Sequence, residues 1–556
     1  MYTRIKKSGK YEYLQICESR REGKKVRQRV IATIGRLDQL KAKGQVEKLV
    51  RSLAKYSDQV LMVLSGQSDP RALTYKIGPG LIFERLWQRS GIKAVINKFV
   101  SNRKYSFSVE RALFLTVLHR LLISGSDRFC SRWRRDYRIK GVEGLELHHL
   151  YRAMAWLGEV IVDQKDSTPF APRCMKDLIE EELFLRNRDL FSSLDLVFFD
   201  TTSIYFEGRG GVSIGKRGNS KDHRPDFPNG SLCENQMVVG VVLDDSGKPL
   251  CCEMWPGNTA DVNTLIPIMD RIRQRFLVNN FCVVADRGMI SKDTIDALQE
   301  EKRKLPYILG ARMRKVKEIR GIVAAYQDIK NYKEVYPESP SSSKAAAPLK
   351  VKEVWQEDRR YILCYNSKQA RKDAADREAI IASLQEKLSS GAKSLIGNKG
   401  YRKYLKINRE TVQIDQEKIR SDAIYDGKWV LQSNLDWPAE QIALKYKELW
   451  QVEYAFRDLK SLFETRPIFH QRDENIRGHV FCSFLALVLR KELERLLEAQ
   501  GYNFEWAEIK QDLTALEETI IEEHGKRLAI RSECQGVCGK VFQAAGVAIP
   551  STIREV

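Results

Sequence analysis

The sequence predicts an α/β protein in which a mixed five-stranded sheet with flanking helices is interrupted by a β-rich insertion. Apolar runs of strand length alternate with helical patterns between residues 191 and 312, which is typical of a sheet covered by helices. Strand-like alternation then dominates residues 313–435 before helical patterns resume. A chain of 556 residues is also too long for one core and predicts several domains.

Residues 1–60 are predicted to form a basic β-hairpin segment, because two alternating runs flank a turn at residues 21–23. The first 40 residues hold eleven Lys and Arg against four Asp and Glu. The whole chain has 94 Lys and Arg against 73 Asp and Glu, a formal net charge of +21. This excess predicts a polyanionic partner, first nucleic acid and second an anionic membrane, with a merely basic enzyme as the alternative.

Residues 61–190 carry mostly helical patterns, and we predict a helical DNA-binding region there. Residues 127–137 form its most basic helix, which also carries an aromatic residue at every fourth position. The aromatic residues are Phe129, Trp133 and Tyr137, and the arginines singled out are Arg132, Arg134 and Arg135. Aromatic residues at this spacing more often pack in a core than stack on bases, so we interpret them as packing residues. The arginines are candidates for phosphate contacts.

Residues 191–312 contain three predicted strands joined by short returns, followed by helix, strand, helix and strand. The strands are expected at residues 194–200, 236–243, 249–255, 281–286 and 306–312. This order is expected of an RNase H-like core, in which the fourth strand lies parallel beside the first. A doubly wound nucleotide-binding sheet would alternate strand and helix from the start, and no phosphate-binding glycine motif is present.

The rest of the chain divides into three further segments. Residues 313–435 are the β-rich insertion domain, with a flexible link at residues 337–348 and a charged helix at residues 368–389. Residues 436–500 supply the final helices of the core. Residues 501–556 are predicted to be a helical C-terminal segment, with residues 504–530 as a candidate dimer contact.

The eleven cysteines show no framework spacing, which predicts reduced thiols in a cytosolic compartment. Cys534 and Cys538 form one isolated C-x₃-C pair, which is weak evidence for zinc. The longest apolar run is about half of the ~20 residues that a membrane helix requires, and the charged N-terminus does not resemble a signal peptide. We therefore expect a cytoplasmic protein without a membrane partner.

Two predicted strands end in an aspartate. Asp200 ends the first strand and Asp286 ends the fourth, so neighbouring strands would bring the two carboxylates to the same edge of the sheet. Carboxylate oxygens suit Mg²⁺. The alternative for either residue alone is a turn cap, since Asp commonly bonds to the backbone after a strand.

Residues 446–460 have the composition of one continuous helix. Tyr446, Glu453 and Lys460 are spaced by seven residues, so they would share one stripe, which Arg457 joins. Glu453 could complete a two-metal phosphoryl-transfer site with Asp200 and Asp286. The alternative is an i, i+4 surface ion pair of Glu453 and Arg457, worth under ~0.5 kcal/mol.

These residues resemble the DDE-type transposases of bacterial insertion sequences, in the group whose final catalytic helix carries Tyr-x₂-Arg-x₃-Glu-x₆-Lys and whose RNase H-like core holds a β-rich insertion. Tyr446, Glu453 and Lys460 stand in register with that signature, while Leu449 replaces its arginine. Five other stretches are similar to these transposases: residues 9–37, 220–229, 253–261, 284–288 and 464–481.

The resemblance implies that Asp200, Asp286 and Glu453 are catalytic residues that bind Mg²⁺, with Mn²⁺ as an alternative. It implies DNA contacts by Tyr446, Arg457, Lys460 and Arg287. Trp429 stands where some relatives stack a flipped base; the alternative is a tryptophan packed within the insertion.

The implied function is that of an insertion-sequence transposase in the bacterial cytoplasm, associated with the nucleoid. It would bind the terminal inverted repeats, cut DNA with a metal-activated water and join the freed 3′-OH ends to target DNA, as a homodimer on DNA. One alternative is an inactive DNA-binding repressor derived from a transposase. Another is an RNase H-like nuclease.

Overall fold

The computed structural model describes residues 2–22, 25–54, 71–165, 167–168, 171–187, 194–208, 210–218, 235–278, 280–337, 347–390, 403–407, 412–462, 465–523 and 526–556. They form two compact units. One contains Met1–Gly78, Gln511–Gly539 and Ala548–Val556, and the other contains Pro79–Lys510 and Lys540–Val547. Residues 338–346 of the predicted link at 337–348, and the similar stretch at 220–229, lie outside the described residues.

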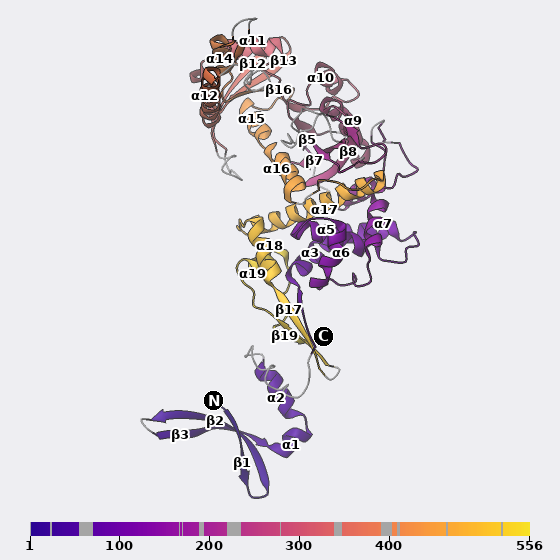
Figure 1. Ribbon diagram of the computed structural model, residues 1–556, viewed down its shortest axis with the longest axis vertical. Helices are drawn as coiled ribbons and strands as arrows, with labels where there is room; N and C mark the ends of the chain where they lie inside the picture. The colour runs from indigo at the N-terminus through magenta and orange to yellow at the C-terminus, as the bar shows by residue number, and fades with distance from the viewer. Residues whose placement is uncertain are drawn as a thin grey trace. The chain divides into compact units, whose positions relative to one another are not determined.

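The centre of the larger unit is a sheet in the strand order β8-β7-β5-β9-β10, of which Figure 1 labels β5, β7 and β8. The strands are β5 (Leu196–Tyr205), β7 (Asn235–Asp244), β8 (Pro249–Pro256), β9 (Cys282–Ala285) and β10 (Tyr307–Gly310), with the two-residue β6 (Lys216–Arg217) beside β7. β9 pairs parallel with both β5 and β10, and β7 pairs antiparallel with β5 and β8. The predicted parallel pairing of the first and fourth strands is confirmed.

The insertion extends this sheet rather than forming a separate β domain, which corrects the prediction of a five-stranded sheet. β16 (Lys428–Ser433) pairs with β10, and β13 (Arg359–Tyr365), β12 (Leu349–Gln356) and β11 (Lys333–Val335) follow in order, giving ten strands in all. The remaining elements of the insertion are α11 (Lys317–Ala325), η3 (Ile329–Asn331), α12 (Ser367–Ser390), α14 (Gln416–Ala423), and the hairpin of β14 (Leu405–Ile407) and β15 (Val412–Ile414).

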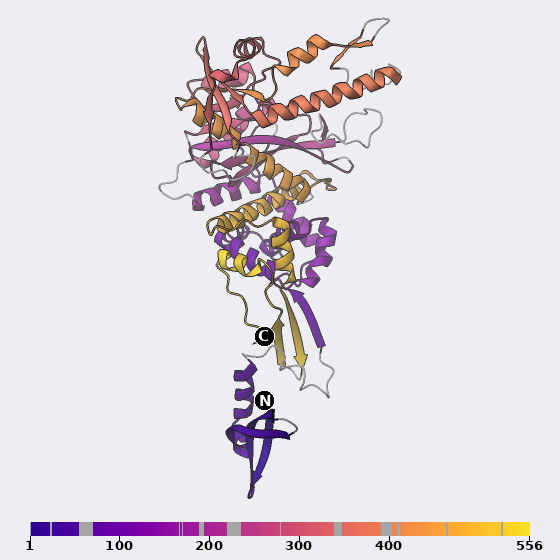
Figure 2. The same ribbon diagram turned by 90° about the vertical axis from the view of Figure 1, so that its left-hand side faces the viewer.

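Helices cover both faces of the sheet (Figure 2). On one face, α9 (Leu265–Phe276) and α10 (Lys292–Gln299), which follow the turn η2 (Asp261–Asn263), pack on a core that includes Val197, Phe199 and Ala285. Successive strand residues point to opposite faces. The neighbours of these residues in β5 therefore face α15 (Ala439–Lys447) and α16 (Trp450–Arg457), which contact β5, β7, β9 and β10.

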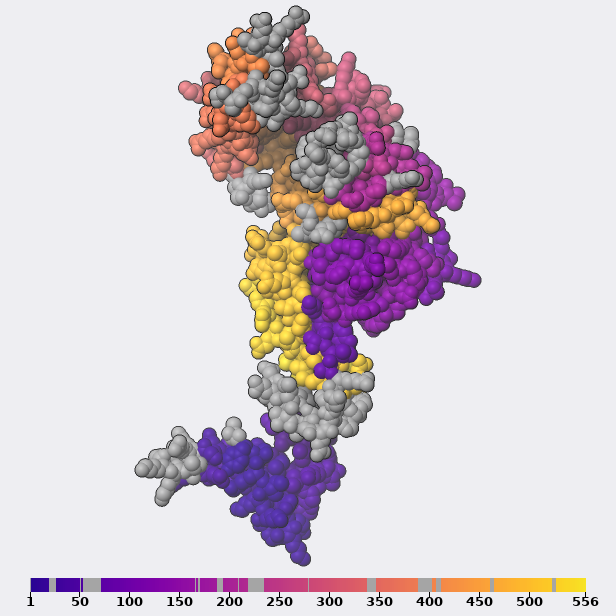
Figure 3. Space-filling view, viewed as in Figure 1, coloured from indigo at the N-terminus to yellow at the C-terminus, as the bar shows by residue number. Residues whose placement is uncertain are grey.

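The helical region of the larger unit surrounds α5 (Val109–Leu122), which is buried along its whole length. Its other members are α3 (Gly78–Arg89), α4 (Ile92–Val100), α6 (Asp127–Trp133) with η1 (Arg134–Asp136), α7 (Leu147–Leu157) and α8 (Met175–Asn187). α17 (Asp473–Glu498) lies between the sheet and α5 and α7 (Figures 1 and 3). A Cβ on Gly478 would lie 1.9 Å from the carbonyl oxygen of Met154, so α7 and α17 can approach this closely only with glycine there.

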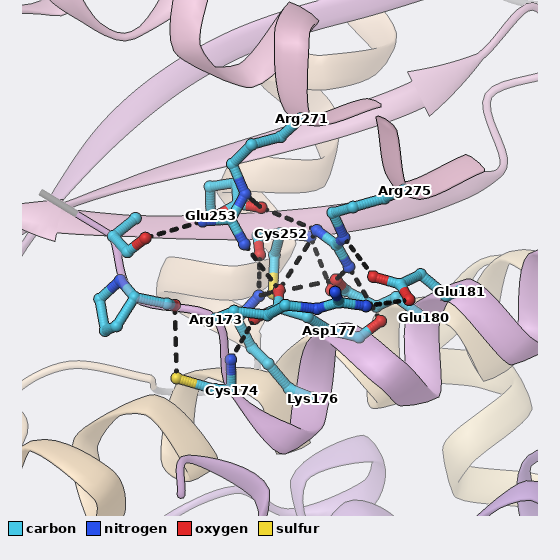
Figure 4. Close-up of polar contacts among 12 residues, drawn as sticks. Arg173, Cys174, Lys176, Asp177, Glu180, Glu181, Cys252, Glu253, Arg271 and Arg275 are labelled. Carbon is cyan, nitrogen blue, oxygen red and sulfur yellow. Dashed lines mark hydrogen bonds and ion pairs between the residues drawn. The ribbon is translucent and has the colours of Figure 1, made fainter. Parts of the chain in front are cut away.

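A buried ion network joins α8 to the sheet and α9, and Figure 4 shows it. Its central residues are Lys176, Asp177 and Glu180 of α8, Glu253 of β8, and Arg271 and Arg275 of α9. Their side chains are all at most 4% exposed, and the three cations balance the three carboxylates. Burial alone would raise the pKa of Asp177, but Lys176 and the two arginines hold this pKa well below its usual range.

The smaller unit contains two antiparallel sheets. The N-terminal sheet has three strands, β1 (Tyr2–Ser8), β2 (Tyr11–Glu22) and β3 (Lys25–Arg36), followed by α1 (Leu37–Ala42) and α2 (Gln45–Ala54). The predicted hairpin is β2–β3, and β1 extends it. The second sheet, in the order β19-β18-β17-β4, joins β4 (Arg71–Lys76) to β17 (Glu517–Glu523), β18 (Lys526–Arg531) and β19 (Ile553–Glu555).

The C-terminal prediction was therefore wrong in part. Residues 501–556 contain the helices α18 (Trp506–Ala515) and α19 (Cys538–Ala545), but residues 517–523 and 526–531 form strands instead of helix. Burial alternates along β17 from Glu517 to Ile520, which fits a sheet paired with β4. None of the helices described has an apolar stretch of the length needed to cross a membrane.

Candidate active site

Asp200 lies in the middle of β5, not at its end as predicted. β5 continues to Tyr205 because its second half stays paired with β7, with Asp200 opposite Val241. The pairing with β9 ends one residue earlier, at Phe199 opposite Ala285. The backbone N–H of Thr201 donates to Asp200 Oδ1 over 2.7 Å. Asp200 is therefore the first residue of β5 beyond its parallel neighbour.

Asp286 follows β9 directly and continues the same row across the sheet. Ala285 is opposite Phe199 on one side and Leu309 on the other, so the next row contains Asp200, Asp286 and Gly310. Residues of one row point to the same face, which here is the face covered by α15 and α16. The register thus brings the two predicted carboxylates side by side.

Tyr446 of α15 reaches this row. Its hydroxyl donates to Asp286 Oδ1 over 3.0 Å. Burial, together with the charges of Asp286 and Asp200, raises the pKa of Tyr446 well above its ordinary value, because all three disfavour the phenolate. Tyr446 is therefore a neutral hydrogen-bond donor beside the carboxylates.

Sequence reasoning missed two residues that shape this row. A Cβ on Gly310 would lie 2.3 Å from the Tyr446 hydroxyl, so glycine leaves the space that the tyrosine fills. Arg312 donates from Nε to the carbonyl oxygen of Arg287 and from Nη2 to that of Gly288, each over 2.9 Å. It thereby holds the loop that follows Asp286. Both residues lie in the predicted strand 306–312. A glycine and an arginine in an otherwise apolar strand were the sequence features that could have identified them.

A third missed residue, Asp261, lies on the opposite face. Its Oδ1 accepts from Thr201 Oγ1 over 2.7 Å, and a Cβ on Gly288 would lie 3.6 Å from its Oδ2. Because Thr201 alternates with Asp200 along β5, this carboxylate supports the strand from the side of α9.

The predicted continuous helix over residues 446–460 is broken, which corrects the single-stripe geometry. α15 ends at Lys447, and Glu448 and Leu449 form a tighter turn before α16 begins at Trp450. The N–H of Leu449 bonds to Tyr446 O and that of Val452 to Leu449 O, a three-residue spacing typical of 3₁₀ geometry. A π-helical turn, η5 (Asp458–Leu462), then contains Lys460. Tyr446, Glu453 and Lys460 therefore belong to three helical segments.

Glu453 and Arg457 lie on the exposed side of α16, opposite its buried residues Val452, Ala455 and Phe456. The Arg457 guanidinium lies 4.5 Å from the ring centroid of Tyr454. Lys460 is half-buried. Leu449, at the position of the signature arginine, is buried at 7% exposure, so it contributes packing there.

The other predicted DNA contacts are scattered over the larger unit. Arg287, Arg132 and Arg135 are exposed, whereas Arg134 donates to the carbonyl oxygens of Val142 and Glu143. Trp133 and Tyr137 are buried and their ring centroids lie 4.1 Å apart, which confirms the packing interpretation for these two. Phe129 is 46% exposed, so the interpretation was wrong for it.

Trp429 is the second residue of β16 and pairs with Cys364. The indole is half-buried, and its Nε1 has no hydrogen-bond partner among the residues described. Base stacking and packing both remain predictions for this residue.

A separate buried group, Asp127, His470 and His479, has three possible metal-ligand atoms within 4.8 Å of one another. In the described part of the chain it is the one group that meets this criterion; Asp200, Asp286 and Glu453 are not gathered so closely, and Cys534 with Cys538 has no third partner. The Arg120 guanidinium lies 3.0 Å from His479 Nδ1 and 3.7 Å from Asp127 Oδ1. A cation is thus already present, and we interpret the group as a structural cluster.

Comparisons with known proteins match the chain to two family models. A family model described as the transposase DDE domain matches residues 192–489, and one described as the N-terminal domain of IS1634 family transposases matches residues 2–69. A solved structure titled as a piggyBac transposase synaptic complex with hairpin DNA is similar at 11% identity and a TM-score of 0.38, over 78% of this chain and 79% of that chain. No curated protein compared with the chain matches it.

The first model spans more than half of the chain and contains the whole row of Asp200, Asp286 and Gly310 together with Tyr446. The second contains the N-terminal three-stranded sheet. Its first residues are thus similar to those of IS1634 family transposases, and the chain belongs to the DDE transposases, enzymes that cleave DNA and transfer its strands.

Proposed function

We propose that Asp200, Asp286 and Glu453 are the catalytic residues and hold divalent cations, Mg²⁺ or alternatively Mn²⁺, at the face of the sheet covered by α15 and α16. The observation that carries this is the register, which puts Asp200 and Asp286 on adjacent strands in one row. Glu453 is added because it stands in register with the Tyr446 and Lys460 signature and because α16, which carries it, contacts β5 and β7. All three donors are carboxylates, which fits Mg²⁺.

Bound divalent cations would supply charge stabilisation for the attacking and leaving oxygens of the phosphodiester. The chain's own residues would place the scissile phosphate at the row of Asp200 and Asp286. We propose that the protein binds the terminal inverted repeats, that water cuts the strand, and that the 3′-OH attacks target DNA. The spacing of Tyr446, Glu453 and Lys460 supports the group with the Tyr-Arg-Glu-Lys signature.

Exposed or half-buried cations of the larger unit are the proposed DNA contacts. Arg287 follows Asp286 directly, Arg457 lies one turn beyond Glu453, and Lys460 lies in the π-helical turn after α16. Arg132 and Arg135 on the helical region are exposed and suit more distant phosphates. Arg134 is also a proposed phosphate contact. Its guanidinium already donates to the carbonyl oxygen of Glu143, so it extends less far into solvent. Trp429 is proposed to stack an unpaired base.

Two DNA ends must be cut in concert, so we propose a homodimer on DNA, in the cytoplasm of a bacterium and associated with its nucleoid. The strands β17 and β18 replace the predicted helix as the candidate dimer contact within residues 504–530. The chain has a net charge of +21, which supports association with DNA.

The test is cleavage of a duplex that carries the inverted repeats flanking the gene, with Mg²⁺, with Mn²⁺ and with EDTA. We expect metal-dependent nicks at the repeat ends and joined products when target DNA is added. Binding of the repeats without cleavage under every metal condition would support a repressor instead. Cleavage of RNA–DNA hybrids without preference for the repeats would support a nuclease.

Replacing Lys460 with alanine should weaken binding of the repeat duplex about threefold to tenfold and reduce its salt dependence by one phosphate contact. The reason is the loss of one cation near the proposed cut. Fluorescence anisotropy over a salt series measures both quantities. Lys302→Ala is the matched control, since Lys302 is exposed and follows α10 on the other side of the sheet. Equal affinity and equal salt slopes for Lys460→Ala and wild type would remove the proposed contact.

A further inference from the structure

Tyr446 is assigned by the family signature to DNA, yet its hydroxyl is already engaged. It donates to Asp286 Oδ1 over 3.0 Å, and Gly310 leaves the space in which it lies. Asp286 and Gly310 lie in one row of the sheet. The strand register therefore fixes the position of the Tyr446 contact. A tyrosine that only contacted DNA from an exposed position would need neither the space left by Gly310 nor the hydrogen bond to Asp286.

We infer that Tyr446 is a positioning residue for the Asp286 carboxylate, and that Gly310 is required for it. A carboxylate has two oxygens and about four lone-pair sites, so a hydroxyl on Oδ1 fixes the rotation of the group and leaves Oδ2 for a cation. Groups that orient a metal ligand typically change metal affinity by about 10–100-fold when removed. This inference rests on the proposed metal site and adds how one of its ligands is oriented.

Two further hydrogen bonds support this orientation of the carboxylate. Arg312 holds the backbone carbonyls of Arg287 and Gly288, so the loop after Asp286 is fixed from one side. Tyr446 fixes the carboxylate from the other side. A Cβ on Gly310 would also lie 2.9 Å from the backbone nitrogen of Arg287, so a larger residue at position 310 would disturb both the tyrosine and this loop.

The first experiment separates positioning from DNA contact. Mn²⁺ binding to the full-length, DNA-free protein is measured by electron paramagnetic resonance, and binding of the repeat duplex is measured in EDTA. For Tyr446→Phe we expect Mn²⁺ affinity to fall by about tenfold or more, with DNA affinity unchanged. A loss of DNA affinity with unchanged Mn²⁺ affinity would overturn the inference. Tyr332→Phe is the matched control, since it loses a similar bond, to the carbonyl oxygen of Tyr326 at 2.8 Å, in the insertion.

The second experiment tests the role of Gly310 through stability. Gly310→Ala should lower the melting temperature, whereas Gly321→Ala, where a Cβ would meet nothing within 4 Å, should not. Tyr446→Phe removes the oxygen 2.3 Å from the new Cβ but leaves Cζ at 3.1 Å. The double variant should therefore be less destabilised than the two single changes predict by addition. Additive losses would overturn the assigned contact between Gly310 and Tyr446.

Asp286→Asn separates this inference from the proposed function on which it rests. If that variant binds Mn²⁺ as wild type does, the metal site itself is wrong and the inference falls with it. If Asp286→Asn loses Mn²⁺ while Tyr446→Phe does not, the metal site stands and the inference alone is overturned.

Discussion

Asp286→Asn should reduce cleavage of the repeat duplex by about 10³-fold or more while leaving the fold and DNA binding intact. A metal ligand contributes to stabilising the charge of the transition state, and its loss raises the barrier by several kcal/mol. Each 1.36 kcal/mol of barrier lowers the cleavage rate about tenfold. Asparagine keeps an oxygen that can accept from the Tyr446 hydroxyl. The substitution therefore removes charge from the row with little change in packing.

The measurement is the rate of strand cleavage at saturating protein, with circular dichroism and anisotropy as checks on fold and binding. Asp293→Asn serves as the control, because Asp293 is an exposed residue in the first turn of α10. Asp200→Asn should match Asp286→Asn, since the two carboxylates occupy the same row. Cleavage by either variant within about tenfold of wild type would be incompatible with the proposed roles.

The pairing of these two aspartates could be predicted from the order of the strands. The second and third strands follow each other on one side of the first strand, and the next helix returns the chain to the other side, where the fourth strand runs parallel to the first. The two aspartates then lie at one level. The position of Asp200 within β5 could not be predicted in the same way. Residues 201–205 pair with β7 and no longer with β9, and their polar threonines and serine suggest a loop when β7 is not considered.

The extent of the sheet and the C-terminal strands depend on partners far away in the sequence. β16 joins the core through β10, and β17 joins β4 through a register that includes the hydroxyl pair Thr74 and Thr519, 2.9 Å apart. Local alternation indicates strands but does not identify their neighbours. Residues 517–531 contain one glycine, Gly525, and no proline, so composition alone did not exclude a helix there.

The break between α15 and α16 shows the limit of helix propensity. Residues 446–460 contain no glycine or proline, so composition favours one helix. The structure instead buries Leu449 in a tight turn and directs Tyr446 to Asp286. Tertiary packing on the sheet thus overrides a weak local preference.

The second large effect concerns stability, and Arg275 of the buried ion network is its most informative position. Its Nη1 lies 2.8 Å from Glu253, its Nη2 donates to Glu180 over 2.6 Å, and its Nε donates to Glu181 over 3.0 Å, with Asp177 also 3.2 Å away. The guanidinium is 1% exposed. Arg275→Met should destabilise the larger unit by about 3–5 kcal/mol, because it leaves a buried negative charge without compensation.

The measurement is the urea midpoint of the transition that exposes α8, β8 and α9, followed by hydrogen exchange. Arg186→Met is the matched control on α8, since its ion pair with Glu182 is exposed and worth at most about 0.5 kcal/mol. A shift no larger than that of the control would show that the network does not depend on charge balance.

A compensating variant tests the reason for the loss. Glu180 also accepts from the N–H of Cys252 over 2.9 Å, and glutamine can keep that bond through its carbonyl oxygen. Arg275→Met combined with Glu180→Gln restores neutrality and should be more stable than Arg275→Met alone.

Burial raises the pKa of Glu180, so this carboxyl is the one expected to take up a proton in the single variant. A carboxyl whose pKa is raised in the folded state stabilises the fold below its unfolded pKa, and this stabilisation is lost as pH rises through the folded pKa. The loss of unfolding free energy in Arg275→Met should therefore grow from acidic to neutral pH.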